Sequence, residues 1–204
     1  MNIVYQIGHS LYLNITNRCT NQCGFCVRYK TDTIQGYNLA LTTEPSVKEI
    51  LAAIGDPSRF REIVFCGYGE PLLRLTEVIA VSKALKEQKI PVRINTNGHG
   101  NLIHGRNIVP EIAPYVSTIS ISLNAENEEV YNQICQPSFG PGTYQKVKEF
   151  INACKTLMPT VVTAVALPQV NINIIKQIVE KELGVRFKLR HYDDIVQENN
   201  YGRE

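Results

Sequence analysis

Three cysteines near the N-terminus carry the clearest chemistry in this chain. Cys19, Cys23 and Cys26 follow a C-x3-C-x2-C pattern, which supplies three close thiolates and no obvious fourth ligand. Electron-transfer ferredoxins hold a [4Fe–4S] cluster with four cysteines. A cluster held by three keeps one iron open to a small molecule, as a catalytic zinc keeps an open position for its substrate. The spacing therefore favours an iron–sulfur cluster that does chemistry at the metal.

The residues between the cysteines suit a loop that curls around a metal centre. We expect Gly24 to allow positive φ and a close approach of the backbone, and Phe25 to shield the cluster from water. Two alternatives stay open from spacing alone. A structural zinc site would need a fourth ligand nearby, whereas the nearest histidine, His9, lies ten residues upstream of the first cysteine. A redox disulfide would leave one cysteine unexplained.

Further motifs follow in order along the chain. They are Ile63-Val-Phe-Cys-Gly-Tyr-Gly-Glu-Pro71, Asn95-Thr-Asn-Gly98 and Ile119-Ser-Ile-Ser-Leu-Asn124. Together with the cysteine run, and over residues 11 to about 192, they resemble the radical S-adenosylmethionine (radical SAM) superfamily. The stretch from residue 11 to residue 106 also looks like the small radical SAM proteins linked to TatD-type hydrolases. That group is named for its neighbours, so the likeness supplies no substrate.

The resemblance implies a role for each motif. Cys19, Cys23 and Cys26 would ligate a [4Fe–4S] cluster, and the open iron would bind the amino and carboxylate groups of S-adenosylmethionine (SAM). The other cofactor-binding candidates are Phe25 beside the adenine, Gly67, Tyr68, Gly69 and Glu70 at the amino group, and Asn95, Ser122 and Asn124 at the ribose and carboxylate. One electron, from a donor such as flavodoxin or ferredoxin, would let SAM be cleaved to a 5′-deoxyadenosyl radical that abstracts hydrogen from a substrate.

Substrate contacts are sought at the ends of the predicted strands. The candidates are Tyr68, His99, His104, Arg106, Arg190, His191 and Tyr192. Residues 98–106 read as a Gly-rich loop that either closes over a ligand or is simply solvated, and its Arg–His pair suits an anionic group. The leading hypothesis is a radical SAM enzyme acting on an unidentified polar small molecule. The alternatives are an activase that generates a radical on a partner protein, and a non-catalytic metal-binding module.

The remaining cysteines and the composition fit this hypothesis. Cys66, Cys135 and Cys154 are expected to be buried free thiols, since free cysteine behaves as a small hydrophobe. The 204 residues suggest one core domain over residues 1–192 and a polar tail over 193–204. No apolar stretch has membrane-spanning length and no secretory signal is evident, so we expect a cytoplasmic protein. With 21 basic and 19 acidic residues and no long run of either sign, nucleic acid is not expected as a partner.

The elements that position these residues alternate between β-branched runs and amphipathic segments, which indicates βαβ units and a parallel sheet. Strands are expected at 11–16, 62–66, 92–95, 118–123, 160–167 and 185–192, and helices at 45–53, 75–88, 107–114, 126–135, 143–156 and 172–183. Six units are too few for a closed eight-stranded barrel. The sequence therefore predicts an α/β fold, an open, partial (β/α)6 TIM-like barrel of parallel strands with a short N-terminal β extension. Polar residues alternate with apolar ones in several strands, which predicts a polar lumen.

Overall fold

The computed structural model describes residues 2–31, 33–34 and 36–191, and its centre is a curved seven-stranded sheet. In spatial order the strands are β1 (Val4–Ile7), β2 (Ser10–Leu13), β5 (Glu62–Phe65), β6 (Val92–Thr96), β7 (Thr118–Ser122), β8 (Thr160–Ala166) and β9 (Arg186–His191). The β1–β2 pair is an antiparallel hairpin, and every later pairing is parallel. Within the described residues β1 and β9 form the two edges. The partial (β/α)6 barrel and its N-terminal β extension are confirmed.

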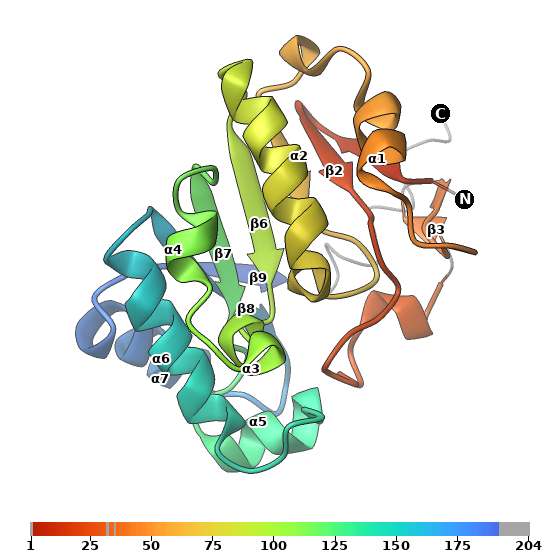
Figure 1. The fold of residues 1–204 in the computed structure, drawn as a ribbon. Coiled ribbons are helices and arrows are strands. Elements are labelled where there is room, and N and C mark those ends of the chain that lie inside the picture. Colours follow the sequence, from red (N-terminus) through yellow and green to blue (C-terminus); the bar gives the residue numbers. More distant parts are fainter. Residues whose placement is uncertain (1, 32, 35, 192–204) are drawn as a thin grey trace.

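Helices connect successive strands. They are α1 (Val47–Ile54), α2 (Leu75–Glu87), α3 (Gly100–His104), α4 (Val109–Ile112), α5 (Glu128–Cys135), α6 (Thr143–Lys155) and α7 (Ile172–Gln177), which continues into the π-helical turn η4 (Ile178–Glu182). Short 3-10 turns are η1 (Val27–Tyr29), η2 (Pro57–Arg59) and η3 (Pro71–Arg74), and β3 (Thr33–Ile34) pairs with β4 (Tyr37–Asn38) in a small hairpin. Figure 1 shows α2, α4 and α6 covering the same face of the sheet.

The two faces of the sheet differ as the alternating pattern predicts. Apolar side chains such as Phe65, Ile94 and Ile121 are fully buried in the core beneath the helices. On the opposite, inner face the strand register aligns polar residues across neighbouring strands, for example Asn95 with Ser120. A parallel sheet covered on both faces would be apolar on both. The inner face is therefore a lumen suited to water or a polar ligand.

A charged pair lies near the end of the sheet where the strands begin. Arg93 on β6 binds Glu62 on β5, with Nη2 and Oε1 2.8 Å apart, and its guanidinium lies 5.9 Å from the ring centre of Tyr12 on β2. Glu62 also accepts from Ser10 Oγ at 3.1 Å. These side chains therefore have partners within the protein, whereas the sequence motifs gather at the other end, where the strands end.

Three local predictions need correction. Residues 98–106 are not an open loop, because α3 fills most of the segment. Helix α1 begins after Ser46, which caps it with a reciprocal hydrogen-bond pair to Glu49, rather than at Pro45. Gly24 does not have positive φ. Tyr192 and the predicted tail over 193–204 lie outside the described residues, and no helix among those described is both long and apolar enough to cross a bilayer.

Candidate active site around the cysteine loop

The start of the cysteine loop is held against the turn that follows β5. A Cβ at Gly69 would lie 2.2 Å from the carbonyl oxygen of Arg18 and 2.5 Å from that of Thr16, so only glycine allows the two backbones to approach. A Cβ at Gly67 would lie 2.2 Å from Asn14 Oδ1. The backbone N–H of Glu70, which follows Gly69, donates to the carbonyl oxygen of Arg18 at 2.8 Å. Both glycines of the motif thus fix where the cysteine loop begins.

The far side of the same loop is bonded to the end of α5. Gln22 N–H donates to the carbonyl of Cys135 at 3.0 Å, and Gly24 N–H donates to the carbonyl of Ile134 at 3.2 Å. Ser138 N–H returns a bond to the carbonyl of Thr20 at 2.9 Å. These contacts hold the loop in an extended, strand-like pairing. They explain why Gly24 does not need a left-handed conformation.

The three cysteine thiols are free and half-buried in the described structure. Burial raises the pKa of Cys19 to about 12 and also raises the pKa of Cys26, while the positive charge of Arg28 acts in the opposite direction on both. The pKa of Cys23 is raised chiefly by a hydrogen bond with the thiol of Cys135, and then by burial. Burial thus favours the neutral thiols, whereas a metal binds the deprotonated form of cysteine.

Hydrogen-bond donors directed at sulfur fit a metal-bound thiolate. The backbone N–H of Asn21 points at Cys19 Sγ from 3.5 Å, and Nδ2 of Asn97 approaches the same sulfur at 3.8 Å. Such donors stabilise the negative charge on cluster ligands. No three His, Cys, Asp or Glu side chains in the described part of the chain gather closely enough to hold a single metal ion. The residues present fit an iron–sulfur cluster by their donor set.

Glu70 joins the ends of two strands rather than facing an open cavity. Its carboxylate accepts from Leu72 N–H at 3.0 Å, from Thr96 Oγ1 at 2.8 Å and from Asn97 N–H at 2.7 Å. The side chain is 2% exposed, and this burial raises the pKa of Glu70 to about 7 although the three donors act to lower it. Glu70 thereby positions Asn97 next to Cys19. Its predicted contact with the SAM amino group stays a prediction.

His99 is a buried bridge between the cysteine loop and α5. Its Nδ1 lies 2.8 Å from Thr20 Oγ1, and its Nε2 lies 2.8 Å from the hydroxyl of Tyr131. The side chain has no exposed surface, and burial lowers the pKa of His99 to about 4, so the ring is neutral at pH 7. Thr20 also accepts from Asn97 Nδ2 at 2.9 Å. The geometry gives His99 a positioning role, which strand-end location alone did not reveal.

The other predicted substrate residues separate into two groups. His104 Nε2 lies 2.8 Å from the carbonyl of Leu72, and Arg106 forms an exposed ion pair with Glu111 at 2.9 Å. Both therefore have partners within the protein, and they lie on or beside α3. Arg190 and His191, at the end of β9, are exposed. The two pairs therefore come from different elements, α3 with the residues that follow it and β9.

The predicted ribose and carboxylate contacts also differ in availability. Asn95 Oδ1 accepts from Arg93 at 2.6 Å, and Asn124 Oδ1 accepts from the backbone of Val165 at 3.1 Å. Ser122 has no protein hydrogen-bond partner for its hydroxyl among the described residues, which leaves it available to a ligand. The Tyr68 backbone N–H donates to Asn14 Oδ1 at 3.2 Å. Asn14 is thus a positioning residue that sequence reasoning missed.

The three remaining cysteines do not share one environment. Cys135 and Cys154 are buried, as predicted, but Cys66 is only half-buried at the end of β5. The proximity of Cys135 to Cys23 could not be read from the sequence, because it depends on the docking of α5 against the cysteine loop.

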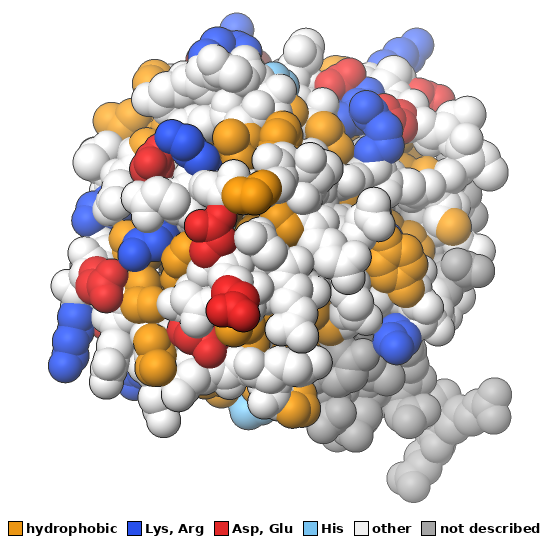
Figure 2. Space-filling model, turned by 90° about the horizontal axis from the view of Figure 1, so that it is seen from below, with side chains coloured by type: hydrophobic (Ala, Val, Ile, Leu, Met, Phe, Trp, Pro, Cys, Tyr) orange, Lys and Arg blue, Asp and Glu red, His pale blue; other side chains and the backbone are white. Residues whose placement is uncertain are grey.

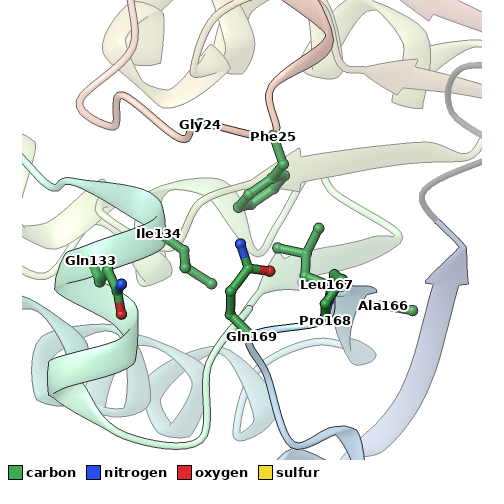
Figure 3. A pocket seen from close by; sticks show the side chains of 8 residues that line it. All are labelled: Gly24, Phe25, Gln133, Ile134, Ala166, Leu167, Pro168 and Gln169. Atoms are coloured by element: carbon green, nitrogen blue, oxygen red, sulfur yellow. The ribbon is translucent and has the colours of Figure 1, made fainter.

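A cavity of about 480 Å³ opens directly beside the cysteine loop. Its lining comes from the cysteine loop, α5 and the segment after β8: Gly24, Phe25, Gln133, Ile134, Ala166, Leu167, Pro168 and Gln169. Figure 3 shows the ring of Phe25 facing Leu167 and Gln169 across this space. Figure 2, which views the molecule from below, shows hydrophobic side chains interspersed with charges of both signs. The cavity offers apolar walls and two amide groups, a lining suited to a flat heterocycle.

Comparison with known proteins agrees with this geometry. The family model of the radical SAM superfamily matches residues 13–181, which is most of the chain. The chain belongs to the radical SAM superfamily. Members of this superfamily use a [4Fe–4S] cluster and SAM, and the known relatives are enzymes. The narrower likeness to TatD-linked members stays a prediction.

The matched relatives differ in chemistry and are longer. The chain is 27% identical over 198 residues to the probable GTP 3′,8-cyclase of Methanocaldococcus jannaschii, covering 93% of this chain and 60% of the relative. It is 32% identical over 130 residues to molybdenum cofactor biosynthesis protein 1 of Drosophila melanogaster, covering 62% and 22%. Streptococcus suis SuiB, solved with its precursor peptide SuiA, superposes with a TM-score of 0.68 at 18% identity, over 98% of this chain and 43% of SuiB. The chain thus spans between about a fifth and three fifths of these relatives.

Proposed function

We propose that this protein is a radical SAM enzyme that cleaves SAM reductively and abstracts a hydrogen atom from a polar small molecule. The observation that carries the proposal is the cavity beside the cysteine loop, which shares Gly24 and Phe25 with that loop. A cofactor bound to a cluster on Cys19, Cys23 and Cys26 would have its remaining atoms at this opening. Once reduced by one electron from an external donor, a bound cluster would supply the electron that cleaves SAM to methionine and a 5′-deoxyadenosyl radical.

The chain's own residues bind and orient the cofactor. Phe25, Leu167 and Pro168 offer apolar walls for the adenine, and the amides of Gln133 and Gln169 offer hydrogen bonds to its edge. An apolar wall also excludes water, which protects a reactive radical. Carbonyls around Gly67 and Gly69 are proposed for the amino group. The hydroxyl of Ser122, which bonds to no other described residue, is proposed for the ribose or carboxylate.

The substrate is proposed to occupy the polar lumen above the Arg93–Glu62 pair. That space is reached from the strand ends, where the cofactor also lies, so a hydrogen on the substrate can approach the cofactor. The probable GTP cyclase among the relatives bears the name of a reaction on a charged nucleotide. This supports a polar and charged substrate class. A one-electron donor such as flavodoxin or ferredoxin is proposed as the partner.

The test is anaerobic reconstitution with iron and sulfide, reduction with dithionite, and measurement of 5′-deoxyadenosine formed from SAM by mass spectrometry. We expect the wild type to form the product, and Cys19→Ala, Cys23→Ala and Cys26→Ala to form none. Cys154→Ala is the matched control, because Cys154 is buried in α6 and lies outside the loop. If the reconstituted wild type binds a full cluster yet produces no 5′-deoxyadenosine, the proposal is wrong.

A further inference from the structure

Edge strand β9 presents a row of cations to the lumen. The strand register aligns Arg186 with Val161, Lys188 with Thr163, and Arg190 with Val165 of β8. Residues paired in this way point to the same side of the sheet, while Phe187 packs on the hydrophobic core at the other side. All three cations are exposed, and none forms an ion pair with another described residue. Three positive charges without an ionic partner among the described residues thus line one wall of the lumen.

From Lys188, a second line of polar residues runs across the sheet, and its members on β8 and β7 carry hydroxyl groups. Thr163 is aligned with Lys188 on one side and with Ser122 of β7 on the other. Thr163 is 6% exposed, and neither its hydroxyl nor that of Ser122 bonds to protein in the described part of the chain. Hydroxyl donors beside an ammonium and a guanidinium are the groups that bind carboxylate and phosphate oxygens.

Protection of a sheet edge does not account for this arrangement. Natural edge strands often carry charges to prevent pairing with other chains. Charges on the edge strand itself are enough for this protection, and it does not require polar residues on the neighbouring strands. Here the polar row extends across β8 and reaches β7, where an inner strand ordinarily carries aliphatic residues. Lys188, Thr163 and Ser122 have in common that each can donate a hydrogen bond to an oxyanion.

We infer that the inner face of β9 is an anion site, in which Lys188, Arg190 and Thr163 hold a phosphate or carboxylate group of the substrate. The inference rests on the proposed function, because it takes the lumen as the substrate space. Ser122, the last residue of the row, is the one assigned above to SAM. The anion of the substrate is therefore held two strands away from the cofactor, and the rest of the substrate extends toward it.

The test measures binding of inorganic pyrophosphate and of citrate by calorimetry to the reconstituted, oxidised protein with saturating SAM at fixed ionic strength. We expect saturable binding of at least one anion, weakened about tenfold or more in the double variant Lys188→Gln/Arg190→Gln. Thr163→Val should weaken it roughly threefold, as expected for one lost hydrogen bond. The tighter probe identifies the class as phosphate or carboxylate.

The matched control is Lys176→Gln/Lys181→Gln, which removes the same charge from exposed positions on α7 and η4. Equal weakening in both double variants would overturn the site, because net charge alone would then explain binding. So would an unchanged affinity in Thr163→Val, an absence of saturable binding, or binding that occurs only without SAM. Formation of 5′-deoxyadenosine by the wild type is scored separately, so loss of the anion site and loss of the proposed function are distinguishable.

Discussion

The bond between Tyr131 on α5 and His99 can be tested against a natural control on the neighbouring helix, Tyr144 on α6. Tyr131 and Tyr144 are both buried tyrosines, and their ring centres lie 5.7 Å apart. The Tyr131 hydroxyl lies 2.8 Å from His99 Nε2. The Tyr144 hydroxyl is also shielded from water but has no hydrogen-bond partner among the described residues. Replacing each by phenylalanine removes the same atom from two different environments.

The expected magnitudes follow from those environments. Tyr131→Phe loses one hydrogen bond and leaves a buried imidazole nitrogen without a partner, which costs about 2 kcal/mol. Tyr144→Phe removes a buried hydroxyl that bonds to nothing, so the unfolding free energy should stay within about 0.5 kcal/mol of wild type or rise. For a chain of this length, a loss of 2 kcal/mol lowers the melting temperature by about 4 to 8 °C.

The assay is urea unfolding of the cluster-free protein at pH 7.5, followed by circular dichroism, with equal m-values required for all three proteins. At this pH His99 is neutral, so its charge does not contribute to the difference. The same loss of stability in both variants would refute the reasoning, because the hydrogen bond to His99 would then contribute nothing. A loss confined to Tyr144→Phe would refute it as well.

Three further predictions concern the cysteine loop and its supports. Gly69→Ala should lower the iron bound per chain after reconstitution severalfold, since a Cβ there would overlap backbone carbonyl oxygens at 2.2 Å and 2.5 Å. Gly24→Ala is the control: a Cβ at Gly24 meets nothing within 4 Å, so this variant should bind as much iron as the wild type. Glu70 holds its proton more tightly when folded, so unfolding releases a proton between pH 4.5 and about 7. Stability should therefore fall as the pH rises through this window, by up to about 3 kcal/mol, and Glu70→Gln should remove that part of the slope in urea titrations at each pH. Cys135→Ala should retain the iron content of the wild type, whereas Cys23→Ala should lose it, as colorimetric iron assays would show; equal loss in both would make Cys135 a ligand.

Local pattern was sufficient to predict the strands and the end of the sheet that carries the site. The alternation around Ile94 and Ile121 predicts which face each strand buries, because side chains in a strand alternate strictly between two faces. Parallel strands end at the same edge, so motifs that follow several strands must meet there. The positions of the three cysteines relative to this edge follow from the same rule.

Contacts between distant segments could not be predicted in this way. Gly100 suggested a flexible loop, yet it starts α3, and a Cβ there would lie 2.9 Å from both Ile108 Cδ1 and Leu72 Cδ1. The glycine serves close packing between elements, which leaves no local signature. The same holds for His99, whose position at a strand end favoured a ligand contact. Only the docking of α5 shows that its ring is enclosed between Thr20 and Tyr131.

The strand register sets the distance between Ser122, in the proposed cofactor region, and Lys188, in the proposed anion site. Neighbouring strands lie about 4.8 Å apart, so the backbones of Ser122 and Lys188, two strands apart, are separated by about 10 Å. A lysine side chain that reaches inward shortens that gap, and a small substrate bound at its anionic end can then span the remainder. Hydrogen abstraction requires the reacting atoms to lie within contact distance. A substrate whose anion is held on β9 and whose reactive hydrogen points toward β7 meets this requirement without any movement of the sheet.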